Sequence, residues 1–138
     1  MGNITSSENS DYAENFYKNG LLESLTIGWK SFGAHTEIDK ETCWVLSNIV
    51  GSNSVYMTKA ILNNPFFTDK IREILTLSEN DPTAQGCAPP NNQARRELLF
   101  MLKNISSGYQ MEILYTLVFK NNIFMQLIPY LDPLKCFI

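Results

Sequence analysis

The chain has 138 residues, of which 44% are hydrophobic and 18% are charged. This length suits one hydrophobic core rather than two domains, and the composition is that of a folded chain. The formal net charge of -3 disfavours a nucleic-acid partner, which usually requires a basic face, but it is compatible with a basic peptide partner.

The first residues match a lipidation pattern. Met1 to Ser6 reads M-G-N-I-T-S, which fits the M-G-x-x-x-[ST] pattern and makes Gly2 a candidate for N-myristoylation. A single acyl chain binds membranes weakly, and no polybasic patch or cysteine follows it, so we do not expect a membrane partner. We expect residues 1–8 to be a disordered polar N-terminus, with lipidation of Gly2 as the alternative.

Apolar periodicity and turn signals then divide residues 9–138 into three similar units. The first, residues 9–52, has predicted helices over 11–18, 21–29 and 37–49, with a turn at Asn19-Gly20 and a capping box from Thr36 to Asp39. The second, residues 53–108, has predicted helices over 53–62, 66–75 and 93–105, with a turn at Asn63-Asn64-Pro65. A surface loop is predicted over 76–92. The third, residues 109–138, has helices over 109–119 and 123–131 and is incomplete.

Two of these helices repeat each other 56 positions apart without a gap: residues 37–49 read EIDKETCWVLSNI and residues 93–105 read QARRELLFMLKNI. One stripe of each helix combines acidic, aromatic and amide side chains at i, i+3 and i+7. These six ridge residues are Glu41, Trp44 and Asn48 on the first helix, and Glu97, Phe100 and Asn104 on the second. They are separate from the apolar positions that predict the core.

The chemistry of the ridge suits an extended basic peptide. An Asn amide can hydrogen-bond both the N–H and the C=O of a peptide backbone, an aromatic face attracts a Lys or Arg side chain, and carboxylates supply counter-charge. The alternative is structural: Trp44 could be a packed core residue, and Asn48 and Asn104 could bridge neighbouring helices. Five other aromatic residues are expected to pack between units. They are Trp29, Phe66, Phe67, Phe119 and Phe124.

The segment KETCWVLSNI, residues 40–49, resembles the third helix of the armadillo repeats of importin alpha (karyopherin alpha), with the pattern K-E-A-x-W-x-[IL]-S-N. The resemblance implies an all-α, right-handed solenoid of about two and two-thirds armadillo repeats. It also implies an adaptor in cytoplasm and nucleus that binds the basic nuclear localisation signals of cargo through Trp44 and Asn48. Phe100 and Asn104 would form a second, weaker rung. Importin beta is not expected as a partner, because residues 1–19 contain no basic segment.

Catalysis is not expected. His35 is the only histidine, and no nucleophile, phosphate-binding or metal-binding motif accompanies it. The cysteines Cys43, Cys87 and Cys136 are odd in number and lack metal-ligand spacing, so we expect reduced thiols, no metal and no cofactor. The alternative to the import adaptor is an armadillo scaffold that joins other proteins, with or without a lipid on Gly2, and does not recognise nuclear signals.

Overall fold

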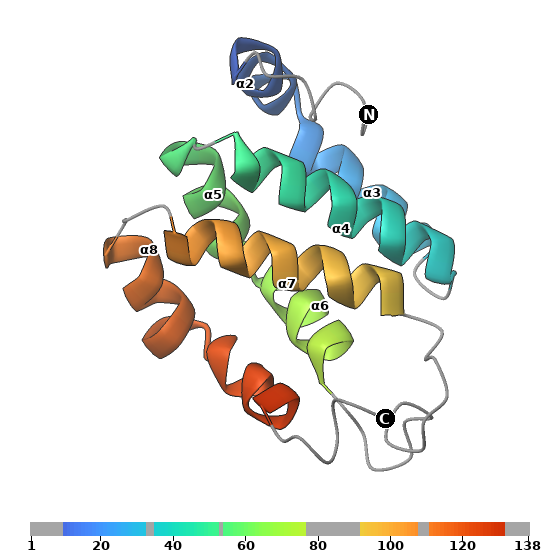
Figure 1. The fold of residues 1–138 in the computed structure, drawn as a ribbon. Helices are drawn as coiled ribbons and strands as arrows, with labels where there is room; N and C mark the ends of the chain where they lie inside the picture. The colour runs from blue at the N-terminus through green and yellow to red at the C-terminus, as the bar shows by residue number, and fades with distance from the viewer. Residues whose placement is uncertain (1–9, 33–34, 53, 77–91, 108–110, 132–138) are drawn as a thin grey trace.

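The structure is a computed structural model that describes residues 10–32, 35–52, 54–76, 92–107 and 111–131. All regular structure in these ranges is helical, which confirms the all-α class (Figure 1). The elements are α2 (Ser10–Lys18), α3 (Leu21–Phe32), α4 (Thr36–Gly51), α5 (Val55–Leu62), α6 (Pro65–Leu75), α7 (Asn92–Ser107), α8 (Met111–Tyr115), the π-helix η2 (Thr116–Lys120) and the 3-10 helix η3 (Phe124–Leu131). None of the helices in the described ranges has the length and apolar character needed to cross a membrane.

Local sequence signals set several of the helix boundaries. Gly20 adopts a φ of +88° in the turn between α2 and α3, a conformation that costs glycine little. Asn64 caps α6, since its side chain accepts a hydrogen bond from the backbone N–H of Phe66 at 3.0 Å, and Pro65 occupies the first helical position. The turns predicted at Asn19-Gly20 and Asn63-Asn64-Pro65 are therefore confirmed.

The capping box predicted from Thr36 to Asp39 is wrong. Thr36 is the first residue of α4, and the N-cap position belongs to His35, whose side chain makes no capping hydrogen bond. Asp39 is buried instead and accepts a hydrogen bond from the indole Nε1 of Trp29 at 2.7 Å. A carboxylate that satisfies a buried indole on the neighbouring helix is no longer available to its own helix terminus.

The two helices that carry the ridge lie side by side. Figure 1 shows α4 and α7 running in the same direction, with α3 on the other side of α4 and with α8, η2 and η3 forming the last layer beyond α7. The contact between α4 and α7 is the most extensive one between two elements of the described structure. The matched segments of the sequence therefore form one continuous two-helix face.

Aromatic packing joins the first two predicted units. Trp29 of α3 is fully buried, and its ring centroid lies 6.0 Å from that of Phe66 and 6.2 Å from that of Phe67 on α6. This confirms the packing role predicted for these three residues, and Phe124 also packs against the core. Phe119 does not: it is 73% exposed and stacks on Tyr115 at 5.1 Å on the outer side of α8 and η2. The ring of Tyr115, and not a residue of another predicted unit, partly covers the Phe119 ring.

Hydroxyl side chains within the helices bond mostly to their own helix. Thr26 donates to the carbonyl of Leu22 at 2.8 Å, and Thr58 donates to that of Ser54 at 2.9 Å. Ser52, Thr68, Thr76 and Thr116 bond in the same way to carbonyls three or four residues earlier. These bonds satisfy polar atoms that would otherwise need partners on neighbouring helices.

Several predictions concern residues outside the described ranges. These are the polar N-terminus at 1–8 with Gly2, the loop residues 77–91 with Cys87, and residues 132–138 with Cys136. The division into three repeat units also stays a prediction. In the third unit, the segment predicted as one helix over 109–119 contains α8 followed by η2, and the segment over 123–131 contains the 3-10 helix η3.

Candidate functional site

The ridge residues of α4 lie on its solvent-facing side. Glu41 is exposed, and Trp44 and Asn48 are half-buried, whereas the intervening residues from Val45 to Ser47 are buried. Trp44 is thus neither a core residue nor a free surface residue, so part of its indole remains available to a ligand. This placement follows from helical geometry, because positions three and four residues apart share one side of a helix.

The ridge residues of α7 occupy the equivalent side. Phe100 is 50% exposed, and Glu97 and Asn104 are half-buried. Their neighbours Leu98, Met101 and Leu102 are buried, among the residues that form the core. We refer to Glu41, Trp44, Asn48, Glu97, Phe100 and Asn104 together as the α4–α7 face.

Two contacts bring the halves of this face together. The hydroxyl of Ser47 on α4 lies 3.1 Å from Glu97 Oε2 on α7 and 2.9 Å from the carbonyl oxygen of Trp44. Further along, a Cβ added to Gly51 would lie 3.5 Å from Nδ2 of Asn104, so the Asn104 amide sits directly against the end of α4. A Cβ at this position would make an ordinary van der Waals contact with the Asn104 amide, so the approach of the two helices does not require a glycine.

The charges on the face are largely paired within the chain. Lys40 Nζ lies 2.6 Å from Glu37 Oε2 and 3.3 Å from Glu41 Oε1. Hydrogen bonds to Glu37 and then to Glu41 raise the pKa of Lys40 above its usual value. On α7, Lys103 Nζ lies 5.6 Å from the ring centroid of Phe100. An incoming cation would compete with Lys40 for Glu41 and with Lys103 for the Phe100 ring.

Asn48 has an unused donor in this arrangement. Its Nδ2 is shielded from solvent and has no hydrogen-bond partner among the described residues. A buried donor without a partner costs about 1–3 kcal/mol, so a rearrangement that gave this amide an acceptor would be favourable. A peptide carbonyl could supply that acceptor after the Asn48 side chain turned outward.

Two further titratable side chains lie on α4 or at its start. Burial raises the pKa of the Cys43 thiol well above its usual range, with smaller contributions from the charges of Asp39 and Glu97, so the thiolate nucleophile is suppressed. His35 lies exposed at the start of α4. The described residues contain no group of three or more His, Cys, Asp or Glu side chains able to hold a metal.

Sequence reasoning missed two residues of this region. Ser47 links the two helices, and Lys103 covers the aromatic ring that was expected to attract a ligand cation. Lys103 could have been found from its i,i+3 spacing to Phe100, which places the two side chains together on a helix. The bond from Ser47 to Glu97 has no such signal, because it depends on how α4 and α7 are aligned.

Comparisons of the chain with protein-family models, with curated proteins and with solved structures find no match.

Proposed function

We propose that this chain is a binding module that takes up an extended peptide with basic side chains along the α4–α7 face. In this proposal the helices form a right-handed armadillo solenoid, and the chain is an importin-alpha-like adaptor for nuclear localisation signals that acts in cytoplasm and nucleus. The observation that supports the proposal is the parallel, side-by-side arrangement of α4 and α7, along which Phe100 is exposed and Trp44, Asn48 and Asn104 are half-buried.

Each side chain has a defined part in this proposal. The exposed portion of Trp44 supports the aliphatic stem of a ligand Lys or Arg, and Glu41 provides counter-charge. Asn48, whose Nδ2 lacks a partner among the described residues, turns to donate to a ligand carbonyl. Phe100 and Asn104 form the neighbouring subsite, which is weaker because Lys103 already occupies one side of the Phe100 ring.

A second candidate function is a scaffold that binds a partner protein without reading basic signals. The pairing of Lys40 with Glu37 and Glu41 favours it, because this ion pair neutralises carboxylates that a basic peptide would need. A partner with uncharged side chains would not have to displace Lys40 or Lys103. Attachment of a lipid to Gly2, which lies outside the described residues, is compatible with this function.

The test is fluorescence anisotropy of a labelled lysine-rich peptide titrated with the full chain. The Trp44→Ala and Asn48→Ala variants are each expected to weaken binding by about 3- to 30-fold, since a cation on an aromatic ring and a buried hydrogen bond each contribute about 0.5–2 kcal/mol. Lys40→Met should tighten binding, because it frees Glu41 for the ligand. Phe32→Ala, an exposed aromatic at the end of α3, is the matched control and should have no effect.

The outcomes separate the two candidates. If the peptide does not bind, or if both Trp44→Ala and Asn48→Ala bind it as well as the wild type does, the adaptor proposal is wrong. A control peptide with Gln in place of Lys that binds equally well to the same face would favour the scaffold. Metabolic labelling with a myristate analogue, with Gly2→Ala as the control, tests the lipid, and absence of label removes it from the scaffold model.

A further inference from the structure

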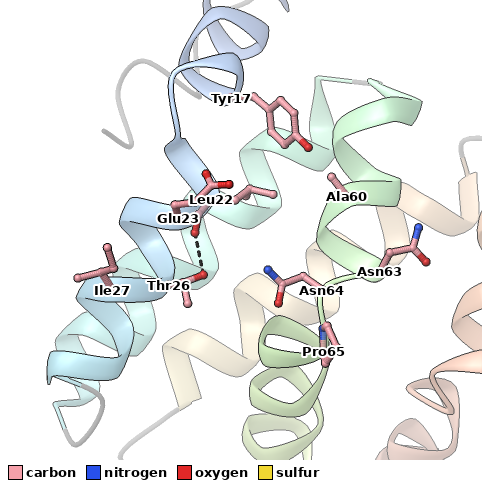
Figure 2. A pocket seen from close by; sticks show the side chains of 9 residues that line it. All are labelled: Tyr17, Leu22, Glu23, Thr26, Ile27, Ala60, Asn63, Asn64 and Pro65. Carbon is pink, nitrogen blue, oxygen red and sulfur yellow. Dashed lines mark hydrogen bonds between the residues drawn. The ribbon is translucent and has the colours of Figure 1, made fainter.

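A cleft lies on another part of the molecule, away from the α4–α7 face. It is an open cleft of about 690 Å³ between the start of α3 and the turn that joins α5 to α6, and neither α4 nor α7 contributes to its lining (Figure 2). Leu22 and Ile27 of α3 form one apolar wall, and Ala60 of α5 and Pro65 of α6 form the other. The volume falls in the range of ligand sites and leaves room for a side chain together with part of the backbone that carries it.

The cleft contains one charged lining residue, and it is acidic. Glu23 is exposed, and no salt bridge or hydrogen bond involves its carboxylate among the described residues. The hydroxyl of Thr26, also in the lining, donates its proton to the carbonyl of Leu22 at 2.8 Å, so its oxygen remains able to accept. The charged and acceptor groups at this end of the cleft are therefore suited to a cation.

A hydrogen-bond donor faces the same space from the opposite wall. The Oδ1 of Asn64 accepts from the backbone N–H of Phe66 at 3.0 Å, which fixes the orientation of the amide. Its Nδ2 has no partner in the described structure, and Figure 2 shows the Asn64 side chain pointing towards α3 across the cleft. This donor could bind a backbone carbonyl of a peptide.

The other polar side chains of the lining, Tyr17 and Asn63, have partners within the chain. Tyr17 lines the cleft with its ring held edge-on against Tyr56, with centroids 5.1 Å apart. Burial, then Tyr56 and last the charge of Glu23 raise the pKa of Tyr17, so its phenol keeps its proton. At the rim, Asn63 Oδ1 accepts a hydrogen bond from the Lys120 ammonium at 3.0 Å, so this oxygen already has a partner within the chain and leaves Glu23 and Thr26 as the acceptors of the cleft.

We propose that this cleft is a docking site for a lysine side chain of a partner polypeptide. The methylene stem packs between the apolar walls formed by α3 and by α5 with α6, and the ammonium binds Glu23 and Thr26. The Nδ2 of Asn64 holds a main-chain carbonyl of the same segment. The site does not depend on the α4–α7 face, because the two surfaces share no residue.

The test uses two capped tripeptides, acetyl-Gly-Lys-Gly-amide and its norleucine analogue, titrated into the ¹⁵N-labelled full chain by NMR. Norleucine keeps the stem of lysine and lacks the ammonium. The lysine peptide should bind in the millimolar range, shift the signals of Ala60 and of the Asn64 side-chain amide, and bind about fivefold more tightly than the norleucine peptide. Such a ratio corresponds to about 1 kcal/mol, the upper value for a partly exposed ion pair.

Two substitutions test whether the Glu23 carboxylate is the group that binds the lysine ammonium. Glu23→Gln should reduce the affinity for the lysine peptide to that for the norleucine peptide, whereas Glu73→Gln, an exposed carboxylate on α6 outside the cleft, should leave it unchanged. Equal affinity for both peptides, or no effect of Glu23→Gln, overturns the proposal. Trp44→Ala should leave these shifts intact, which separates this site from the proposed function of the α4–α7 face.

Discussion

The buried hydrogen bond between α3 and α4 permits a quantitative prediction. Trp29 is fully buried, Asp39 is 6% exposed, and the indole Nε1 donates to Asp39 Oδ1 at 2.7 Å. Asp39→Ala leaves the indole N–H inside the core without an acceptor, which costs about 1–3 kcal/mol, and also removes a bond to a charged acceptor. We expect the free energy of unfolding to fall by about 3 kcal/mol.

Asp39→Asn separates charge from hydrogen bonding. The amide oxygen can still accept from Trp29, so the indole stays satisfied, and only the extra strength of a charged acceptor and the favourable position of the carboxylate in the first turn of α4 are lost. The expected loss is about 1 kcal/mol. The double variant Trp29→Phe with Asp39→Ala should be less destabilised than the sum of the two single variants. The difference between that sum and the double variant should be roughly 1–3 kcal/mol.

Urea unfolding followed by far-ultraviolet circular dichroism measures the stability of the wild type and of these four variants. Glu37→Ala is the matched control, since this exposed carboxylate is two residues from Asp39 and pairs only with Lys40; it should change stability by less than about 0.5 kcal/mol. The reasoning is refuted if Asp39→Ala is as stable as the control, or if the Asn and Ala variants at position 39 are equally unstable.

Three further predictions concern stability and reactivity. Phe67→Ala should cost about 3–5 kcal/mol in thermal or urea unfolding, because the Phe67 ring is fully buried against Trp29 and Phe66; a loss under 1 kcal/mol would contradict this packing. Gly20→Ala should cost about 1–2 kcal/mol because of its positive φ, whereas Gly28→Ala, with nothing within 4 Å of the added Cβ, should be neutral or stabilising. Because burial raises the pKa of Cys43, its thiol should resist alkylation at pH 8 until the chain unfolds, as mapped by peptide mass spectrometry. The same shift means that the contribution of the Cys43 thiol to stability is complete below about pH 8.5 and is lost as the pH rises above that value. Cys43→Ala should therefore reduce the decrease in the free energy of unfolding with rising pH.

Periodicity predicted the outward and inward sides of the central helices well. The spacing of Glu41, Trp44 and Asn48 separated them from the apolar positions of the same helix, and in the structure Glu41 is exposed and Trp44 and Asn48 are half-buried. The Asn-Gly and Asn-Pro turn signals were equally informative, because they depend on the local conformational preferences of single residues. These successes share one property: each depends on residues close together in the chain.

The failures depend on partners from other parts of the chain. Asp39 has the spacing of a capping residue, yet a tryptophan ten positions earlier determines where its carboxylate goes. Phe119 is as apolar as Phe67, but only the arrangement of α8 and η2 decides that its ring stays outside. The cleft lined by Glu23 and Asn64 could not be predicted either, since it exists only where α3 meets the turn between α5 and α6.

The hydroxyl bonds inside the helices have a consequence for how the helices are aligned. Since Thr26, Thr58 and similar residues hydrogen-bond to carbonyls of their own helix, these hydroxyl groups make no polar link to a neighbouring helix. The polar links that do join the central helices include Trp29 to Asp39, Ser47 to Glu97, and Arg95 to the Ile74 carbonyl at 2.8 Å. Loss of one such link should leave the helices intact while letting a neighbouring pair shift along its length.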